Sequence, residues 1–334
     1  MFNDETILIT GGTGSFGQKF IEHVLENYNP RKLIIYSRDE LKQFNMEKSL
    51  KERFRDAGAL RFFIGDVRDK ERLMRALHNV NYIVHAAALK QIPAAERDPF
   101  ECIKTNIMGA QNVINAAIDS GVKKVIALST DKAANPVNLY GASKLCSDKL
   151  FVSGNNYSGD DGPAFSVVRY GNVVGSRGSV VPYFLEAKKK GVIPITDERM
   201  TRFWITLEHG VKFVIDSLSR MKGGEIFVPK IPSCNILTLA EAIAPGCKIE
   251  YVGIRPGEKL HEVMITSDDS RNTSEFDNFY SIFPQFIELA SLNGGCITYN
   301  CQQGKQVEEG FEYNSKDNKN ILTVDQLRNI INSI

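Results

Sequence analysis

The first half of the chain alternates short apolar runs with longer amphipathic stretches. Such alternation is typical of parallel strands that are joined by helices. The runs that we expect as strands are Thr6–Thr10, Leu33–Tyr36, Arg61–Ile64, Tyr82–His85, Lys124–Leu128 and Phe165–Tyr170. The stretches that we expect as helices are Phe16–Glu26, Leu41–Arg55, Lys70–Leu77, Pro99–Ser120 and one that begins near Tyr140. The pattern therefore predicts an α/β fold with a doubly wound parallel sheet.

The pattern loosens after about Val173, where irregular segments separate shorter elements. Weaker patterns there predict two helices and two strands, Val180–Lys190, Leu207–Ser219, Glu225–Val228 and Lys248–Val252. The stretch Thr266–Asp317 is polar and weakly patterned, and it predicts no element. We therefore expect residues 1–172 to form the sheet domain and residues 173–334 to form a smaller C-terminal α/β sub-domain, with some crossing of the chain between the two.

Composition excludes several classes of protein. The 334 residues carry 41 Lys and Arg against 40 Asp and Glu, a net charge of +1, and 43% of them are hydrophobic. This is the balance of an ordinary globular chain, without the basic surplus that nucleic-acid binding needs. No apolar run approaches the roughly 20 residues that span a bilayer, no signal-peptide pattern is present, and the cysteines form no Cys-x-x-Cys pair. We therefore expect a cytoplasmic protein with no metal site and no nucleic-acid or membrane partner.

A glycine-rich turn follows the first expected strand directly. The segment Thr10–Gly17 contains the pattern Gly-x-x-Gly-x-x-Gly and leads into the first expected helix. Glycine allows a tight turn and a close backbone approach, and the N–H groups at the start of a helix bind a pyrophosphate. A glycine pattern alone is weak evidence, but the order strand, turn, helix predicts a Rossmann-type dinucleotide site. Its predicted residues are Gly11, Thr13, Gly14, Ser15, Phe16 and Gly17.

The residues after the second expected strand indicate which dinucleotide binds. An acidic residue at this strand tip accepts a hydrogen bond from the 2′-hydroxyl of NAD, whereas basic residues suit the 2′-phosphate of NADP. Here Ser37 and Arg38 come first and Lys42 follows one turn later, which favours NADP. The alternative is a solvated, charged loop in which Asp39 contacts NAD. The predicted cofactor residues of this segment and of the next two strand ends are Ser37, Arg38, Asp39, Glu40, Leu41, Lys42, Asp66, Val67 and Ala86.

Candidate catalytic side chains lie at the end of the fifth expected strand and on the helix after it. Tyr140 and Lys144 are one helical turn apart and share a face, and a nearby ammonium lowers the pKa of a tyrosine that acts as a base. Just upstream stand Thr130, Asp131 and Lys132, and the Thr130 hydroxyl could bind the substrate oxygen that Tyr140 deprotonates. Tyr-x-x-x-Lys by itself often marks only the surface of an amphipathic helix. Its occurrence together with the glycine turn argues against a chance match.

Together these motifs resemble the extended short-chain dehydrogenase/reductase family over essentially the whole chain. Most members of that family act on nucleotide sugars, as 4-epimerases, decarboxylases or 4,6-dehydratases. The pair Asp131-Lys132 is characteristic of the inverting 4,6-dehydratases, and longer strings such as Leu128–Lys144 and Arg255–Glu262 agree. The resemblance further implies cofactor contacts by Lys90, Thr105, Tyr140, Lys144 and Val173.

The resemblance also implies a reaction, the removal of water from UDP-N-acetylglucosamine with inversion at C5. Tyr140, activated by Lys144, takes the 4-hydroxyl proton while a hydride passes from C4 to NADP. Lys132 then removes the C5 proton, and Asp131 assists departure of the 6-hydroxyl. We expect the pKa of Lys132 to be depressed, because a lysine acts as a base only in its neutral form. Hydride return to C6 and protonation of C5 on the opposite face give UDP-2-acetamido-2,6-dideoxy-β-L-arabino-hex-4-ulose. This product is expected to enter pseudaminic acid synthesis for flagellin or surface glycans.

The same resemblance implies a UDP-sugar site in loops at the carboxyl end of the sheet, where arginines bind phosphate oxygens. The implied substrate residues are Lys90, Lys132, Asn172, Arg177, Gly178, Ser179, Val180, Val181, Arg202, Arg255 and Glu258. One alternative is a UDP-sugar 4-epimerase, which needs Tyr140 and Lys144 but not the Asp131-Lys132 pair. Another is a catalytically inactive regulator that senses NADP. Relatives commonly pair through the helices that carry Asn106 and Tyr140, so we expect a homo-oligomer, a dimer or a hexamer.

Overall fold

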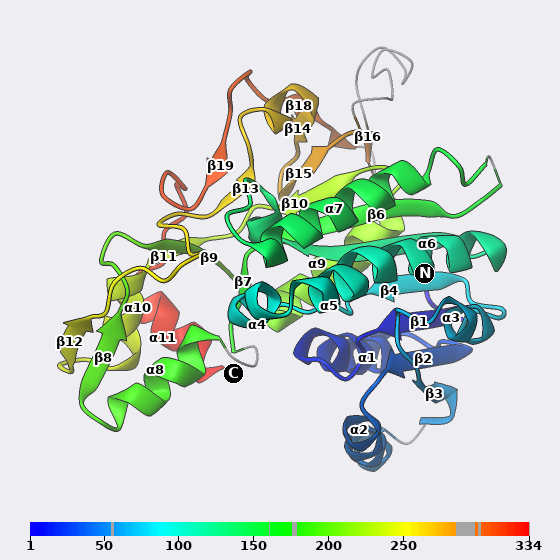
Figure 1. Cartoon of the computed structure of the whole chain (residues 1–334), viewed down its shortest axis with the longest axis horizontal. Coiled ribbons are helices and arrows are strands. Elements are labelled where there is room, and N and C mark those ends of the chain that lie inside the picture. Colours follow the sequence, from blue (N-terminus) through cyan, green and yellow to red (C-terminus); the bar gives the residue numbers. More distant parts are fainter. Residues whose placement is uncertain (55–56, 160, 176–178, 285–297, 300–301, 334) are drawn as a thin grey trace.

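The computed structural model describes residues 1–54, 57–159, 161–175, 179–284, 298–299 and 302–333. Within this part of the chain, a ten-stranded sheet runs through the centre of the molecule (Figure 1). Its strands are β1 (Thr6–Thr10), β2 (Lys32–Ser37), β3 (Leu60–Ile64), β4 (Tyr82–His85), β5 (Lys124–Thr130), β6 (Ala164–Tyr170), β10 (Ile226–Pro229), β14 (Thr273–Glu275), β15 (Phe279–Ile282) and β18 (Lys305–Gln306). Their order across the sheet is β18-β14-β15-β10-β6-β5-β4-β1-β2-β3.

Neighbouring strands from β3 to β10 run parallel, which confirms the predicted doubly wound parallel sheet. Because β1 lies between β2 and β4, the chain reverses its direction of travel across the sheet there, and α/β sheets bind ligands at such a switch point. Strands β15, β14 and β18 extend the sheet in antiparallel sense beyond β10. They come from the stretch Thr266–Asp317, whose two-to-four-residue strands are too short to give a clear sequence pattern.

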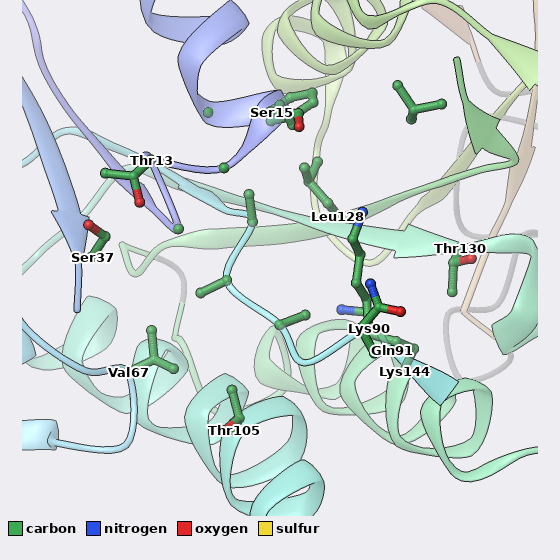
Figure 2. A pocket seen from close by; sticks show the side chains of 18 of the residues that line it. Thr13, Ser15, Ser37, Val67, Lys90, Gln91, Thr105, Leu128, Thr130 and Lys144 are labelled. Carbon is green, nitrogen blue, oxygen red and sulfur yellow. The ribbon is translucent and has the colours of Figure 1, made fainter. Parts of the chain in front are cut away.

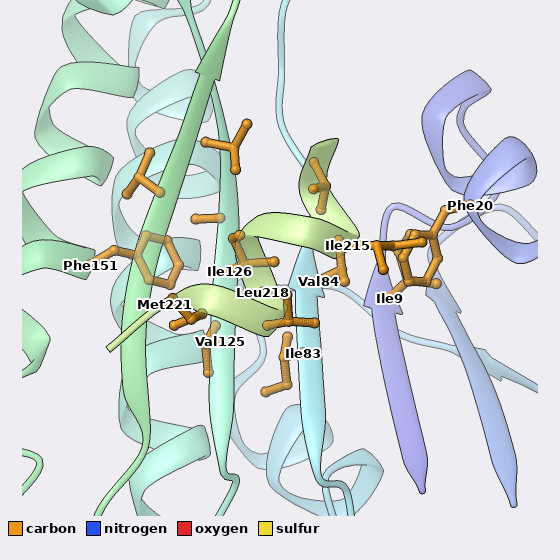
Figure 3. Packing of buried hydrophobic residues seen from close by; sticks show 14 of the residues in the cluster. Ile9, Phe20, Ile83, Val84, Val125, Ile126, Phe151, Ile215, Leu218 and Met221 are labelled. Atoms are coloured by element: carbon orange, nitrogen blue, oxygen red, sulfur yellow. The ribbon is translucent and has the colours of Figure 1, made fainter. Parts of the chain in front are cut away.

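Helices cover both faces of the sheet. On one face α3, α6 and α7 pack side by side, and α7 lies against β5 and β6; on the other face α9 lies against the same two strands and packs on α1. Figure 3 shows Ile215 and Leu218 of α9 in contact range of the apolar side chains of the sheet. The helices of this part are α1 (Ser15–Asn27), α2 (Glu40–Arg53), α3 (Lys70–Ala76), α4 (Ile92–Arg97), α5 (Pro99–Ile103), α6 (Gly109–Asp119), α7 (Leu139–Gly154) and α9 (Leu207–Arg220), with short turns η1 (Ala57–Ala59), η2 (Lys104–Met108) and η3 (Asp131–Ala133).

The main hydrophobic core lies between the sheet and these helices. Ile9 of β1, Ile83 of β4 and Ile126 of β5 are completely buried, because a parallel sheet is covered on both faces (Figure 3). Phe20 of α1 and Phe151 of α7 pack on this layer and are also completely buried. The apolar strand runs therefore form the rigid platform from which the strand ends project.

A second core lies in the C-terminal part of the chain and includes Trp204, Leu239 and Leu327. It is built from α8 (Val180–Lys188), β8 (Val192–Ile195), α10 (Ile236–Ile243) and α11 (Val324–Asn332), with β12 (Lys248–Tyr251) paired to β8. In another small sheet, β9 (Thr201–Ile205) lies between β7 (Asn172–Val173) and β11 (Ser233–Asn235). Two further pairs are β13 (Val263–Ile265) with β19 (Tyr313–Asn314), and β16 (Thr298–Tyr299) with β17 (Gln302–Gln303). The short turn η4 (Asp269–Asn272) precedes β14. The loosely patterned C-terminal stretch thus contains helices as well as several short strands, and α8, α10 and α11 pack with β8 around this separate core.

The stretch Pro99–Ser120, which the sequence predicts as one helix, is interrupted. Helix α5 passes into the π-helical turn η2 before α6 continues to Asp119. A π-helical turn contains one residue more than an α-helical turn. Because apolar residues recur through the whole stretch, the sequence pattern does not reveal this extra residue. Such π turns occur often at functional sites.

Candidate active site

A cavity of about 810 Å³ opens at the carboxyl ends of the parallel strands. The predicted site residues that line it are Gly11, Thr13, Gly14, Ser15, Phe16, Gly17, Ser37, Arg38, Asp39, Lys42, Asp66, Val67, Ala86, Lys90, Thr105, Thr130, Lys132, Tyr140, Lys144, Asn172, Val173 and Ser179. Predicted residues that the structure describes outside this lining are Glu40, Leu41, Asp131, Val180, Val181, Arg202, Arg255 and Glu258. Arg177 and Gly178 lie outside the described residues. The fold thus gathers the glycine turn and the catalytic candidates around one space.

The glycine turn joins β1 to α1 at one side of the cavity, where Figure 2 shows Thr13 and Ser15. Helix α1 begins at Ser15 with Gly14 as its N-cap, and no side chain caps this terminus. A Cβ atom on Gly17 would collide with the carbonyl oxygen of Gly12, so the helix packs this closely on the turn only with glycine at that position. An uncapped helix N-terminus in a cavity wall suits the pyrophosphate of a dinucleotide.

The end of β2 carries the side chains expected at the adenosine ribose. The Asp39 carboxylate accepts a hydrogen bond from the Lys42 backbone N–H at 2.9 Å and lies 2.8 Å from the Lys42 Nζ. These contacts with Lys42 hold the pKa of Asp39 below its usual value. Arg38 is about half exposed and its Nη1 lies 3.6 Å from an oxygen of Asp66. The acidic residue of this loop is therefore engaged as the cap of α2, while Arg38 borders the cavity.

The π-helical turn η2 supports the cavity wall opposite the glycine turn. Asn106 donates a hydrogen bond to the Leu89 carbonyl at 2.9 Å and accepts one from the Leu89 N–H at 2.8 Å, so it clamps the loop after β4. Its amide also donates to Ser143 of α7 at 2.9 Å. The neighbouring Thr105 lines the cavity (Figure 2), and its buried hydroxyl has no hydrogen-bond partner among the described residues. The turn therefore ties the loop that carries Lys90 to the helix that carries the catalytic candidates.

The catalytic candidates form a connected polar group. The Tyr140 side chain shares a hydrogen bond with Thr130, whose hydroxyl donates to Asp131 Oδ1 at 2.8 Å. The Lys132 ammonium donates to the same oxygen at 3.0 Å. Asp131 is completely buried, and within the described part of the chain its second oxygen, Oδ2, has no hydrogen-bond partner. This oxygen can accept or hold a proton that a reaction requires.

The expected lowering of the Tyr140 pKa is wrong for the protein by itself. Burial raises the pKa of Tyr140 to about 12, and the charge of Lys132 and the hydrogen bond with Thr130 offset only part of this rise. The cation that acts on Tyr140 is Lys132, not Lys144. Burial lowers the pKa of Lys144, and the carboxylate of Asp148 opposes that effect. Tyr140 therefore carries its proton at neutral pH, because burial disfavours the phenolate by more than the nearby Lys132 charge favours it.

The expected depression of the Lys132 pKa is also wrong for the protein by itself. Burial lowers this pKa, but the charges of Asp131 and Glu262 outweigh burial and raise it above its usual value. The Lys132 Nζ lies 3.6 Å from a Glu262 oxygen and donates to the Asn172 side-chain oxygen at 3.4 Å. Lys132 is thus an ammonium held between two carboxylates.

The candidate phosphate-binding arginines differ in how they are placed. The Nη atoms of Arg202 donate to the backbone carbonyls of Thr201, Leu260 and Lys259 at 2.8–3.0 Å, so this guanidinium is largely engaged within the protein. The Arg255 side chain is 61% exposed and lies 4.0 Å from Glu258. Arg255 therefore has the greater freedom to meet a ligand.

Comparison with known proteins identifies the family. The family model described as polysaccharide biosynthesis protein matches residues 7–284. The chain belongs to this family. It is 57% identical over 334 residues to the UDP-N-acetylglucosamine 4,6-dehydratase (inverting) of Campylobacter jejuni serotype O:23/36, with 99% of this chain and 98% of that protein covered.

Other relatives include a UDP-glucose 4-epimerase of Rickettsia canadensis, which is 42% identical over 291 residues and 84% of each chain. Among solved structures, Pen from Bacillus thuringiensis superposes with a TM-score of 0.89 at 34% identity, over 100% of this chain and 98% of that chain. The predicted resemblance to extended short-chain dehydrogenase/reductase enzymes of nucleotide sugars is confirmed by these relatives.

Two buried acids near the catalytic candidates were missed by the sequence analysis. Asp148 lies one turn beyond Lys144 on α7, accepts from the Ser129 hydroxyl at 2.8 Å and lies 3.4 Å from the Arg169 guanidinium. The spacing of Asp148 from Lys144 could have revealed it, since residues four apart share a helix face. Glu262 lies far from Lys132 in the sequence, and no local pattern links the two.

Side chains that could bind a metal ion do not cluster in the described part of the chain. In the same residues we find no helix with the length and apolar character needed to cross a membrane.

Proposed function

We propose that the protein is an NADP-dependent UDP-N-acetylglucosamine 4,6-dehydratase that inverts C5 and yields UDP-2-acetamido-2,6-dideoxy-β-L-arabino-hex-4-ulose. The observation that carries this proposal is the contact of Lys132 with Asp131 at 3.0 Å, beside Thr130 and Tyr140 at the cavity. This group supplies both a base and an acid in addition to the side chains that oxidise an alcohol. The sequence similarity of this chain to the inverting dehydratase of Campylobacter jejuni, which extends over 99% of this chain, supports the same function.

In the proposed mechanism Tyr140 acts as a phenolate, so it must first release its own proton to solvent; it then takes the proton of the sugar 4-hydroxyl, with Thr130 hydrogen-bonded to the reacting oxygens. When bound, NADP supplies a hydride acceptor for C4 and later a hydride donor for C6. The C4 ketone makes the C5 proton acidic, and Lys132 removes it after passing its own ammonium proton to Asp131, 3.0 Å away. Asp131 provides the proton with which the 6-hydroxyl leaves as water, and its unpartnered Oδ2 is the atom that can carry this proton. A proton then returns to C5 on the opposite face.

NADP is the proposed cofactor, rather than NAD, because of the contacts at the end of β2. Asp39 caps α2 and pairs with Lys42, so its carboxylate is already engaged within the first turn of that helix. Arg38 borders the cavity with half of its side chain exposed, where a 2′-phosphate would add a charge-assisted contact. The glycine turn and the N-terminus of α1 fit the pyrophosphate of a dinucleotide.

Several further expectations belong to the same proposal. Residues 1–172 would chiefly hold the cofactor and residues 173–334 the UDP-sugar, with β10, β14, β15 and β18 crossing back into the central sheet. We propose that the enzyme acts in the cytoplasm as a homo-oligomer and supplies pseudaminic acid synthesis. The proposed residues at the UDP-sugar are Lys90, Lys132, Asn172, Arg177, Gly178, Ser179, Val180, Val181, Arg202, Arg255 and Glu258.

The test is incubation of the protein with UDP-N-acetylglucosamine and NADP in deuterated water, followed by mass spectrometry. A dehydratase gives a ketosugar that has lost one water and gained deuterium at C5. A 4-epimerase, the second candidate because of the Rickettsia relative, gives a product of unchanged composition. Lys132→Ala should abolish C5 exchange, and normal turnover of that variant would refute the role of Lys132 as the base.

A further inference from the structure

Glu262 is a buried carboxylate beside Lys132 that the proposed mechanism does not use. It follows the loop after Glu258 and directly precedes β13, and its side chain is 3% exposed. One oxygen lies 3.6 Å from the Lys132 Nζ and 3.6 Å from the Arg202 Nε. The other oxygen, Oε2, lies 4.0 Å from the Lys259 Nζ, and none of the residues that the structure describes forms a hydrogen bond with it. An acid is rarely buried without ideal partners unless it has a role beyond stability.

The backbone holds Glu262 firmly in this place. Its N–H donates to the Ser315 hydroxyl at 2.9 Å, and its carbonyl accepts from the Ser315 N–H at 2.8 Å. Lys259 donates to the carbonyl of Ala134, just beyond Lys132, at 2.6 Å. The loop of Glu262 is therefore fastened both to the C-terminal strand β19 and to the catalytic strand end.

We propose that Glu262 is a positioning residue for Lys132, which it holds in place and whose working pH range it sets. This inference rests on the proposed function, in which Lys132 takes the C5 proton. Asp131 attracts the ammonium from the side of Thr130, and Glu262 attracts it from the side of β13. The two contacts together hold a flexible side chain in one place at the cavity wall.

The charges around Lys132 support this role. Asp131 and Glu262 are the carboxylates that face it, and Arg202, Lys90 and Lys259 are the cations nearby, with Tyr140 at the same end of the cavity. Without the Glu262 charge, one carboxylate would face these three cations. The pKa of Lys132, which Asp131 and Glu262 raise, would then fall.

The experiment compares C5–deuterium exchange in Glu262→Gln and wild-type enzyme over a range of pH at saturating UDP-N-acetylglucosamine and NADP. Exchange rises as Lys132 loses its proton, so the midpoint of the rise reports its pKa. We expect the midpoint of Glu262→Gln to lie lower by about one pH unit or more, as the loss of one close countercharge predicts. Glu225→Gln removes another buried carboxylate, one bonded to Ser166 and Tyr299 away from the cavity, and should leave the midpoint unchanged.

A midpoint in Glu262→Gln equal to that of wild type, with rates lower at every pH, would show a merely structural role and overturn the inference. Glu262→Asp keeps the charge but draws it back from Lys132, so it should lower kcat and shift the midpoint less in the same direction. Wild-type kcat and midpoint in Glu262→Asp would also overturn the inference, even if the glutamine variant failed to fold. If wild-type enzyme forms no ketosugar, the proposed function itself fails, which is a distinct result.

Discussion

The buried histidine under the cavity gives a quantitative prediction of acid sensitivity. His85 ends β4 with 1% of its surface exposed, and its Nδ1 lies 2.8 Å from the Thr10 hydroxyl. The oxygen of that hydroxyl accepts from the N–H groups of Ala86 and Ala87, both at 3.2 Å, so its single proton is directed to His85. Nδ1 of His85 is therefore a hydrogen-bond acceptor. If the ring were protonated, its Nδ1–H and the Thr10 O–H would both be donors and would repel each other.

The magnitude follows from the shift of the His85 pKa. Burial, with a smaller contribution from Lys144, lowers this pKa from 6.5 to about 3. The unfolded chain takes up the proton first as the pH falls, so the stabilisation is complete above about pH 6.5 and is lost progressively toward pH 3. Between pH 7 and pH 5 the loss amounts to about 2 kcal/mol, since one pKa unit corresponds to about 1.4 kcal/mol.

The assay is urea unfolding followed by circular dichroism at both pH values, for wild type and for His85→Gln. We expect the variant to be less stable at pH 7, since the hydrogen bond between Thr10 and position 85 changes. Glutamine does not titrate, so position 85 of the variant takes up no proton between pH 7 and pH 5. Carboxylates contribute equally to the acid loss of both proteins, so the difference between the two losses isolates His85. We expect wild type to lose about 2 kcal/mol more than the variant. Equal losses within about 0.5 kcal/mol would refute the argument, because no proton would then be linked to His85.

Three other substitutions test the site. Gly141→Ala would push a Cβ atom into the carbonyl oxygen of Lys132, and such overpacking costs about 1–3 kcal/mol of stability. We expect steady-state kinetics to show a lower kcat and calorimetry to show an unchanged affinity for NADP. Arg38→Ala should weaken NADP about tenfold in Kd, or about 1.4 kcal/mol, and leave NAD unaffected; equal losses for both dinucleotides would contradict the 2′-phosphate contact. Asp148→Asn breaks the buried pair with Arg169, so urea unfolding should show a loss of about 3–5 kcal/mol, and a loss below about 1 kcal/mol would argue against that pairing.

Much of the sheet and the cofactor turn follows from local patterns. The apolar run Thr6–Thr10 is β1 without change of bounds, and Tyr82–His85 is β4. Such runs are recognisable because a parallel strand buries both faces and so consists almost wholly of apolar residues. The short strands of the stretch after Thr266 bury few residues each, and only their pairing with β10 makes them part of the sheet.

The pKa values of the catalytic side chains could not be predicted from local sequence patterns. Lys132 and Tyr140 were recognisable as a base and an oxidising tyrosine, but both pKa directions were wrong. Glu262 raises the pKa of Lys132 from a loop more than a hundred residues away in sequence, and Lys132 rather than Lys144 acts on Tyr140. A pKa depends on distance in space and on burial, and neither is visible in residue order.

The sequence by itself determined the six parallel strands of the first half, the glycine turn and the residue types that can carry out the chemistry, because each of these depends on neighbouring residues. Only the tertiary structure decided which of them meet. It turned Arg202 toward backbone carbonyls, engaged Asp39 as a helix cap and placed Lys132 between Asp131 and Glu262. Contacts between distant segments arise from packing of the whole chain, and these contacts fix the charges that a reaction in the cavity would meet.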